Sequence, residues 1–179
     1  MSPDDDEQQA AGHAIENIVA SPGPLENAAE WLSSLALAAM ILLIGSEAIV
    51  RNVFGGSLQI TDEICGYLLV AVTFLSMSVS EAHGAFHRVE LIQARLSPAA
   101  RIRLQIAFDA CSLLASALVA WQVTRLSMNA FRAEDVAPTP LQTPLWIPQV
   151  VMGVGMALLC FTLLRSMAAK VRRLKQVSA

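Results

Sequence analysis

Four long apolar segments, separated by more polar stretches, dominate the pattern of hydrophobic and polar positions along this chain. They cover about residues 31–50, 62–82, 102–126 and 145–165. The hydrocarbon layer of a bilayer is about 30 Å thick and is crossed by roughly 20 helical residues, whose backbone hydrogen bonds are then made within the helix. The pattern therefore predicts an all-α integral membrane protein with four transmembrane helices.

A short fifth helix is predicted between the second and third of these spans. Its apolar positions recur at helical spacing and are Phe86, Val89, Ile92 and Leu96. Basic residues lie on another side of the same segment, and a helix with this pattern lies in the headgroup region instead of crossing the bilayer. We therefore expect a short interfacial helix here.

The connection between the third and fourth spans combines apolar residues with four prolines. These are Pro138, Pro140, Pro144 and Pro148. Proline lacks the backbone donor that a regular helix needs, whereas the apolar neighbours do not suit a free linker. We expect this segment to pack against protein or against lipid headgroups.

Three regions follow one another along the chain. Residues 1–24 form an acidic tail, which we expect to be mobile because its composition provides too little apolar surface to bury. Residues 25–168 form a four-helix membrane domain, and residues 169–179 form a basic tail.

Composition supports a membrane protein. Hydrophobic residues make up 55% of the chain and charged residues 15%, whereas about a quarter of a soluble domain is charged. The three cysteines, Cys65, Cys111 and Cys160, lie one each in spans two to four without a CxxC spacing. We interpret them as small apolar residues and not as metal ligands or disulfide partners.

Lysine and arginine are distributed unequally between the two sides of the membrane. With four spans, the N-terminus, the connection 82–103 and the C-terminus share one side and carry zero, four and five basic residues. The other side carries three, which are Arg51, Arg125 and Arg132. Short segments rich in lysine and arginine stay in the cytoplasm. Because nine basic residues lie on the side of the termini and three on the other side, we predict that both termini and the interfacial helix are cytoplasmic.

Ionisable residues inside spans are candidates for functional sites, and Glu47 and Asp109 are two of them. Glu47 precedes Arg51 by one helical turn, so a local ion pair explains it. The alternative for Glu47 is a proton or ion site. Asp109 lies near the cytoplasmic end of span three, where it either reaches the headgroups or faces the other helices.

Asp62 and Glu63 open the second span. Thr61 is predicted as the N-cap of this helix, and the two carboxylates would then complement the helix dipole. The alternative is that Asp62 and Glu63 pair with a cation of a partner subunit. Glu81, at the other end of the span, is expected to be solvated.

No residue pattern in the sequence indicates catalysis or a cofactor. His83 and His87 are one helical turn apart but lack a third ligand on that face, so a metal site is not favoured. A membrane haem protein needs axial histidines inside its helix bundle, and none lies at that depth. We predict that the chain is not an enzyme, holds no cofactor or metal and binds no nucleic acid.

Several short motifs together resemble one transporter family. In chain order they are RNVF at 51–54, DE at 62–63, GAFHRVEL at 84–91 and TPLWIP at 143–148. Their order and spacing over about residues 25–168 resemble the DctQ-like small permease subunit of tripartite ATP-independent periplasmic (TRAP) transporters.

The resemblance implies a non-catalytic subunit of the bacterial inner membrane. Such a subunit pairs with a large permease subunit that holds the substrate and sodium sites, and a periplasmic solute-binding protein delivers an organic acid. The small subunit would brace the large one, and the proline-rich loop could touch the binding protein. The candidates for contact with a partner are Arg51, Asp62, Glu63, His87, Glu90, Pro144, Trp146, Pro148, Gly153 and Ala157.

Two other functions stay open at this point. A self-contained small proton-coupled transporter would use Glu47 or Asp109, and a membrane anchor of a redox complex would carry haem. The spans show no pair of broken helices of the kind that forms a transport site. Gly153 and Ala157 in span four are small residues that allow close helix packing, which favours the accessory subunit.

Overall fold

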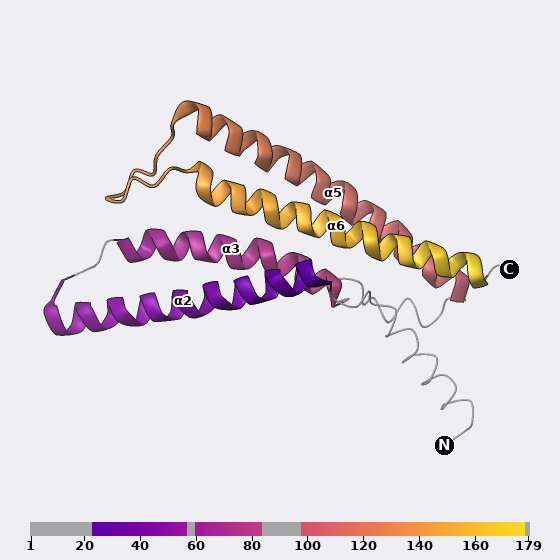
Figure 1. Cartoon of the computed structure of the whole chain (residues 1–179), viewed down its shortest axis with the longest axis horizontal. Coiled ribbons are helices and arrows are strands. Elements are labelled where there is room, and N and C mark those ends of the chain that lie inside the picture. The colour runs from indigo at the N-terminus through magenta and orange to yellow at the C-terminus, as the bar shows by residue number, and fades with distance from the viewer. Residues whose placement is uncertain (1–22, 57–59, 84–97, 178–179) are drawn as a thin grey trace, which may run out of the picture.

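The computed structural model describes residues 23–56, 60–83 and 98–177, and these are almost entirely helical (Figure 1). The four helices are α2 (Pro24–Phe54), α3 (Ile60–Ala82), α5 (Pro98–Ala133) and α6 (Trp146–Val177). All four are long and apolar enough to cross a membrane. The predicted fold class is therefore confirmed, whereas the interfacial helix expected near residues 86–96 lies outside the described residues.

The helix ends follow from local residue chemistry. Pro24 opens α2, where its missing N–H costs nothing, and Gly55 ends the same helix with a φ of 64°, a conformation that glycine adopts without strain. The expectation that Thr61 is the N-cap of α3 is wrong. The helix already includes Ile60, and the Thr61 hydroxyl donates a hydrogen bond to Glu47 on α2 instead.

Three of the helices are longer than a bilayer requires. They contain 31 residues in α2, 36 in α5 and 32 in α6. At 1.5 Å per residue each is about 45 Å or more in length, compared with a hydrocarbon thickness of about 30 Å. These helices must therefore tilt or extend beyond the hydrocarbon layer.

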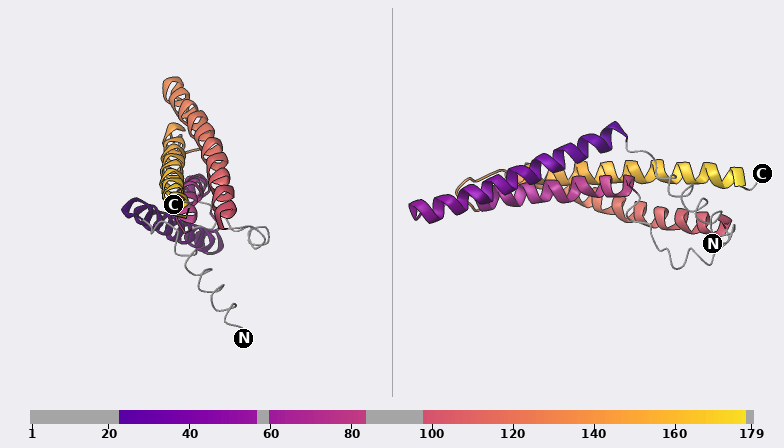
Figure 2. Two further views of the ribbon diagram at one scale, coloured as in Figure 1. Left: turned by 90° about the vertical axis from the view of Figure 1, so that its right-hand side faces the viewer. Right: turned by 90° about the horizontal axis from the view of Figure 1, so that it is seen from below.

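The helices form two antiparallel pairs. α2 packs along α3, α5 packs along α6, and α3 and α6 join the two pairs. Of the described helices, the outermost two, α2 and α5, do not pack extensively against each other. Figure 2 shows the same arrangement from two further directions. The order across the molecule is α2, α3, α6 and α5, which is an open arrangement and not a closed bundle.

The two ends of this arrangement differ. At the terminal end lie Pro24, Ala82, Pro98 and Val177, and at the loop end lie Phe54, Ile60, Ala133 and Trp146. The ribbons of α5 and α6 cross near the terminal end and spread apart toward the loop end (Figure 1).

The apolar core lies on the central helix α6. Its buried residues are Met156, Leu159 and Leu163, and the side chains packed against them come from α3 and α5: Phe74, Met77, Leu113 and Ala120. Gly155 lies against the backbone of α3, since a Cβ atom added there would be 2.7 Å from the carbonyl carbon and oxygen of Phe74. A glycine at this position allows α3 and α6 to approach closely.

The proline-rich connection forms a narrow hairpin. Val136 and Pro144 pair across it as an antiparallel bridge. The Ala137 N–H donates to the Thr143 carbonyl at 3.0 Å, and the Leu145 N–H donates to the Asp135 carbonyl at 3.0 Å. The segment is therefore held by its own backbone and is not a free linker.

The outer surface of α2 is strongly apolar. Its buried residues are Glu26, Ala29 and Ser33, all in its first three turns. The exposed apolar residues along the rest of the helix include Leu35, Ile41, Leu42, Ile49 and Val53. Such a surface is stable only against hydrocarbon or another apolar protein surface.

Candidate partner interface and buried polar contacts

Glu47 joins α2 to the first turn of α3 at the loop end. The Thr61 hydroxyl donates to Glu47 Oε2 at 3.2 Å, and Arg51 Nη2 lies 3.9 Å from Glu47 Oε1. The local pair expected between Glu47 and Arg51 is present. The Arg51 side chain is 70% exposed, so it is also accessible to a partner.

Glu63 holds the proline-rich hairpin against α3. The Tyr67 hydroxyl donates to Glu63 Oε1 at 2.8 Å, and Thr139 and Thr143 of the hairpin lie beside the same carboxylate. Of the described side-chain atoms, Glu63 Oε2 and Thr139 Oγ1 are both buried without a hydrogen-bond partner, so the hairpin lies against this carboxylate without a direct bond from Thr139. The expectation that the hairpin packs against protein is confirmed here.

The two adjacent acids therefore have different surroundings. Glu63 is buried and faces the hairpin, whereas Asp62 is exposed. A cation of another subunit can reach Asp62 directly, but Glu63 is already surrounded by groups of its own chain.

Asp109 forms a buried ion pair between α5 and α6. Its side chain is 0% exposed, and the Lys170 ammonium donates to Asp109 Oδ2 at 2.7 Å. Of the two positions that the sequence left open for Asp109, the structure shows the one that faces the other helices.

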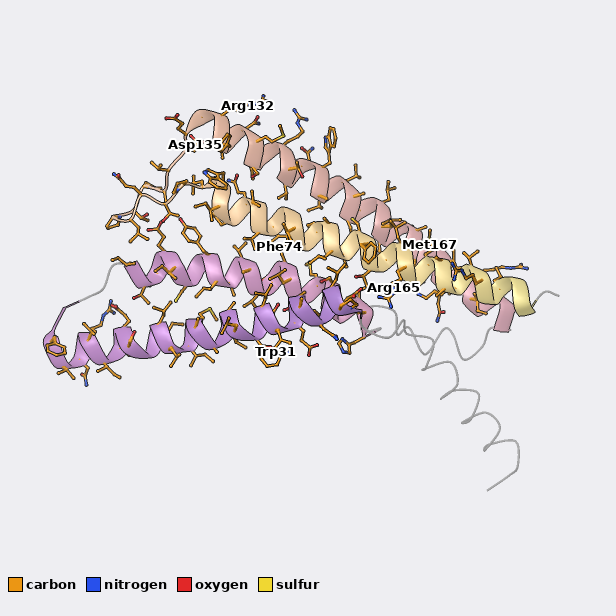
Figure 3. The ribbon with its side chains drawn as sticks, viewed as in Figure 1. Trp31, Phe74, Arg132, Asp135, Arg165 and Met167 are labelled. Carbon is orange, nitrogen blue, oxygen red and sulfur yellow. The ribbon has the colours of Figure 1, made fainter. Side chains whose placement is uncertain are left out.

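Glu26 forms a second ion pair, between α2 and α6, in which the carboxylate is buried and the Arg165 side chain is 39% exposed. The Glu26 side chain is 4% exposed, and Arg165 Nη1 lies 3.5 Å from Glu26 Oε1. The Thr162 hydroxyl donates to the same oxygen at 3.2 Å. Figure 3 shows Arg165 beside the beginning of α2.

Sequence reasoning missed this second pair. Glu26 lies just beyond the acidic tail, and Arg165 is one of the five basic residues counted at the C-terminal side. The spacing of Thr162 and Arg165 places them on one face of a helix, which was an available sign of a polar contact. Their partner lies 136 positions before Thr162, and no local pattern identifies it.

Two further expectations concern the end of α3. Glu81 was expected to be solvated, and this is wrong because the residue is 5% exposed. The end of α3 packs within the molecule, which removes Glu81 from solvent. His83 is exposed, and its ring nitrogen Nδ1 lies 2.9 Å from the Val79 carbonyl. His87 and Glu90 lie outside the described residues.

The small residues of α6 divide between the inside and the outside of the molecule. Gly155 is buried against α3, whereas Ala157 is exposed and Gly153 is half-buried. The nearest atom to a Cβ added at Gly153 would be Val123 Cγ1, at 4.0 Å. Gly153 and Ala157 therefore remain accessible to a partner, and Gly155 serves the internal contact.

An aromatic contact closes the loop end of the α5–α6 pair. Phe131 and Trp146 meet edge to face, with ring centroids 5.7 Å apart and an interplanar angle of 86°. Pro144 and Pro148, on either side of Trp146, are half-buried. Next to this contact is a shallow groove lined by Ser127, Met128, Phe131, Arg132, Trp146 and Val150.

The ion pairs and the carboxylates described above lie toward the two ends of the molecule. Along α6, at 1.5 Å per residue, Arg165 lies about 29 Å and Lys170 about 36 Å from Trp146. Glu47 and Glu63 lie at the opposite end. The middle of the described helices is apolar, with Met156, Leu159 and Leu163 in the core. Within the described residues, this arrangement places no converging charged groups at mid-depth of the kind that binds a transported ion.

Comparison with known proteins places these features in a family. Residues 40–173 match the family described as tripartite ATP-independent periplasmic transporters, DctQ component. The match begins within α2, includes α3 and α5, and ends within α6.

One relative is the isethionate TRAP transporter permease protein DctMQ of Oleidesulfovibrio alaskensis. It is 29% identical to this chain over 112 residues, which are 63% of this chain and 18% of the relative. The chain thus spans less than a fifth of that relative's length. With four apolar helices and a family match over most of its length, this chain belongs to the DctQ component family of tripartite ATP-independent periplasmic transporters.

Proposed function

We propose that this chain is the small membrane subunit of a TRAP-type secondary transporter in the bacterial inner membrane. In this proposal it braces a large permease subunit during sodium-coupled uptake of an organic acid that a periplasmic binding protein delivers. Membership of the DctQ family supports the proposal. The relative named DctMQ supports it as well, because the matched part is only 18% of that permease protein and the remainder is large enough for a permease.

The observation that carries the proposal is the open order α2, α3, α6, α5 with an apolar centre. A transport site near the midplane needs polar groups and interrupted helices. The four described helices are continuous, and Asp109 is paired with Lys170. Substrate translocation is therefore assigned to a partner and not to this chain.

The outer surface offers the contacts that a bracing subunit needs. We propose that the large subunit covers part of the apolar surface of α2 or α6, with Gly153 and Ala157 allowing close approach. Arg51 and Asp62 are exposed at the loop end and would make polar contacts there. Residues 25–168 form the membrane domain in this proposal, and both termini face the cytoplasm.

Co-purification tests the proposed partnership. An affinity-tagged version of this chain is co-expressed with the large permease protein encoded in the same genome and is purified in mild detergent. We expect the large subunit to be recovered in a stoichiometric complex, also when excess untagged chain is added after lysis. Recovery of this chain without the large subunit, from membranes that contain both, would reject the bracing role.

A further inference from the structure

Helix α6 contacts both outer helices through cations in its last turns that pair with buried carboxylates. Arg165 lies 3.5 Å from Glu26 on α2, and Lys170 lies 2.7 Å from Asp109 on α5. The two cations are five residues apart, which turns them to different sides of the helix. Each side faces one of the two outer helices.

These contacts matter because, beyond the packing of α2 along α3 and of α5 along α6, the outer helices have few contacts with the rest of the molecule. α2 and α5 do not pack extensively against each other, and each packs mainly along one neighbour. The buried residues of α2 are limited to Glu26, Ala29 and Ser33, so its contacts at the terminal end are concentrated around Glu26, while the Thr61–Glu47 bond holds it to α3 at the loop end. Apolar packing in a membrane gives little preference for one rotation of a helix over another, because lipid tails are as apolar as the protein surface.

An ion pair with a buried carboxylate favours one rotation of the helix over the others. Glu26 is 4% exposed and Asp109 is 0% exposed on their side chains. A carboxylate removed from water in this way must keep a cation beside it, since an uncompensated buried charge is strongly unfavourable. A rotation or sliding of α2 or α5 that separated either pair would therefore be disfavoured.

We infer that α6 sets the positions of α2 and α5, with Glu26–Arg165 and Asp109–Lys170 as positioning pairs that determine the surface presented to the large subunit. The part of this inference that concerns the large subunit rests on the proposed function. The part that concerns the helix positions does not.

The Asp109–Lys170 pair gives the sharper test, because its partners can be exchanged or removed together. Four variants are compared: Lys170→Met, the double change Asp109→Leu with Lys170→Met, the exchanged pair Asp109→Lys with Lys170→Asp, and Arg172→Gln. Replacing a whole buried pair by apolar residues usually preserves stability, whereas removing one partner does not. Arg172 is exposed on the same helix, so its variant is the matched control for the loss of one positive charge.

The first readout is a distance in the isolated chain. Spin labels are attached at Glu30→Cys on α2 and Ala110→Cys on α5, both exposed positions, after Cys65, Cys111 and Cys160 have been replaced by alanine. We expect one narrow distance distribution for the native pair, the exchanged pair and Arg172→Gln. The apolar double variant should remain folded, with a native thermal midpoint, but give a broadened or shifted distribution.

The second readout is recovery of the large subunit by co-purification. Lys170→Met should reduce recovery by roughly tenfold or more, the apolar double variant should also reduce it, and the exchanged pair should restore it. If the apolar double variant keeps both the native distances and full recovery, the positioning role is wrong and the pair only neutralises its own charges. If the distances change as expected while recovery stays native, the positions are set by these pairs but do not determine the partner surface. Neither result depends on whether the complex transports a substrate.

Discussion

At the scale of single residues, three carboxylates of the described helices each have an identified polar partner. Glu47 joins α2 to Thr61 at the start of α3, Glu63 accepts from Tyr67 on its own helix and lies beside Thr139 and Thr143 of the hairpin, and Asp109 pairs with Lys170. The contact between Glu47 and Arg51 could be predicted from sequence because its partners are one helical turn apart. Tyr67 is likewise one helical turn from Glu63, but the Lys170 partner of Asp109 could not be predicted, because it lies 61 residues further along the chain.

Removing the Glu63 carboxylate should loosen the hairpin. In Glu63→Ala, Tyr67 loses its acceptor and Thr139 and Thr143 lose the carboxylate that lies beside them, which costs about 1–3 kcal/mol. We expect a spin label at Gln142 to become more mobile in this variant. Asp62→Ala, one residue earlier and exposed, is the control and should leave the label unchanged. Equal mobility in the two variants would show that Glu63 does not hold the hairpin.

At the scale of helices, the number and extent of the elements could be predicted but their rotation could not. The four helices follow from the length of the apolar segments, which is a local property. α6 is apolar on most of its circumference, so its sequence does not show which side faces the protein. For that reason Gly153, Gly155 and Ala157 could all be identified as small packing residues, but only the structure separates Gly155, which lies against Phe74, from the other two.

Substitution of Gly155 should destabilise the chain itself. A Cβ atom at this position would lie 2.7 Å from backbone atoms of Phe74, so Gly155→Ala must move α3 away from α6, at a cost of about 1–3 kcal/mol. The thermal midpoint of the purified chain in detergent measures this effect. Gly153→Ala is the control, since its added methyl group would meet only Val123 at 4.0 Å, and it should unfold at the native temperature. A native midpoint for Gly155→Ala would contradict the close approach of α3 and α6.

A larger residue at Gly153 should affect assembly and not folding. Leu at this half-buried position would begin about 4.0 Å from Val123 on α5, and the part of the side chain that reaches past α5 would keep a partner helix at a distance. We expect Gly153→Leu to insert and fold normally but to recover less of the large subunit in co-purification. Recovery equal to that of the native chain would place the partner on another surface.

At the scale of the whole molecule, the distribution of basic residues predicts the orientation in the membrane. Nine lysines and arginines lie on the side of the termini and three on the other side. Single cysteines at Asp5, Glu90 and Lys175 should therefore react only with a reagent that reaches the cytoplasm, and a cysteine at Val136 should react from the periplasm. Labelling of position 136 from the cytoplasm alone would show that the orientation is the opposite of the predicted one.

The open order of the four helices and their apolar centre lead to the central claim, that this chain supports transport without providing the pathway. Uptake into proteoliposomes under an inward sodium gradient tests this claim most directly, with radiolabelled organic acids that include isethionate, the compound in the name of the relative. We predict no uptake by the chain alone, and uptake with the large subunit and the binding protein that is lost when this chain is omitted. Uptake of any of these acids by the isolated chain would contradict the account.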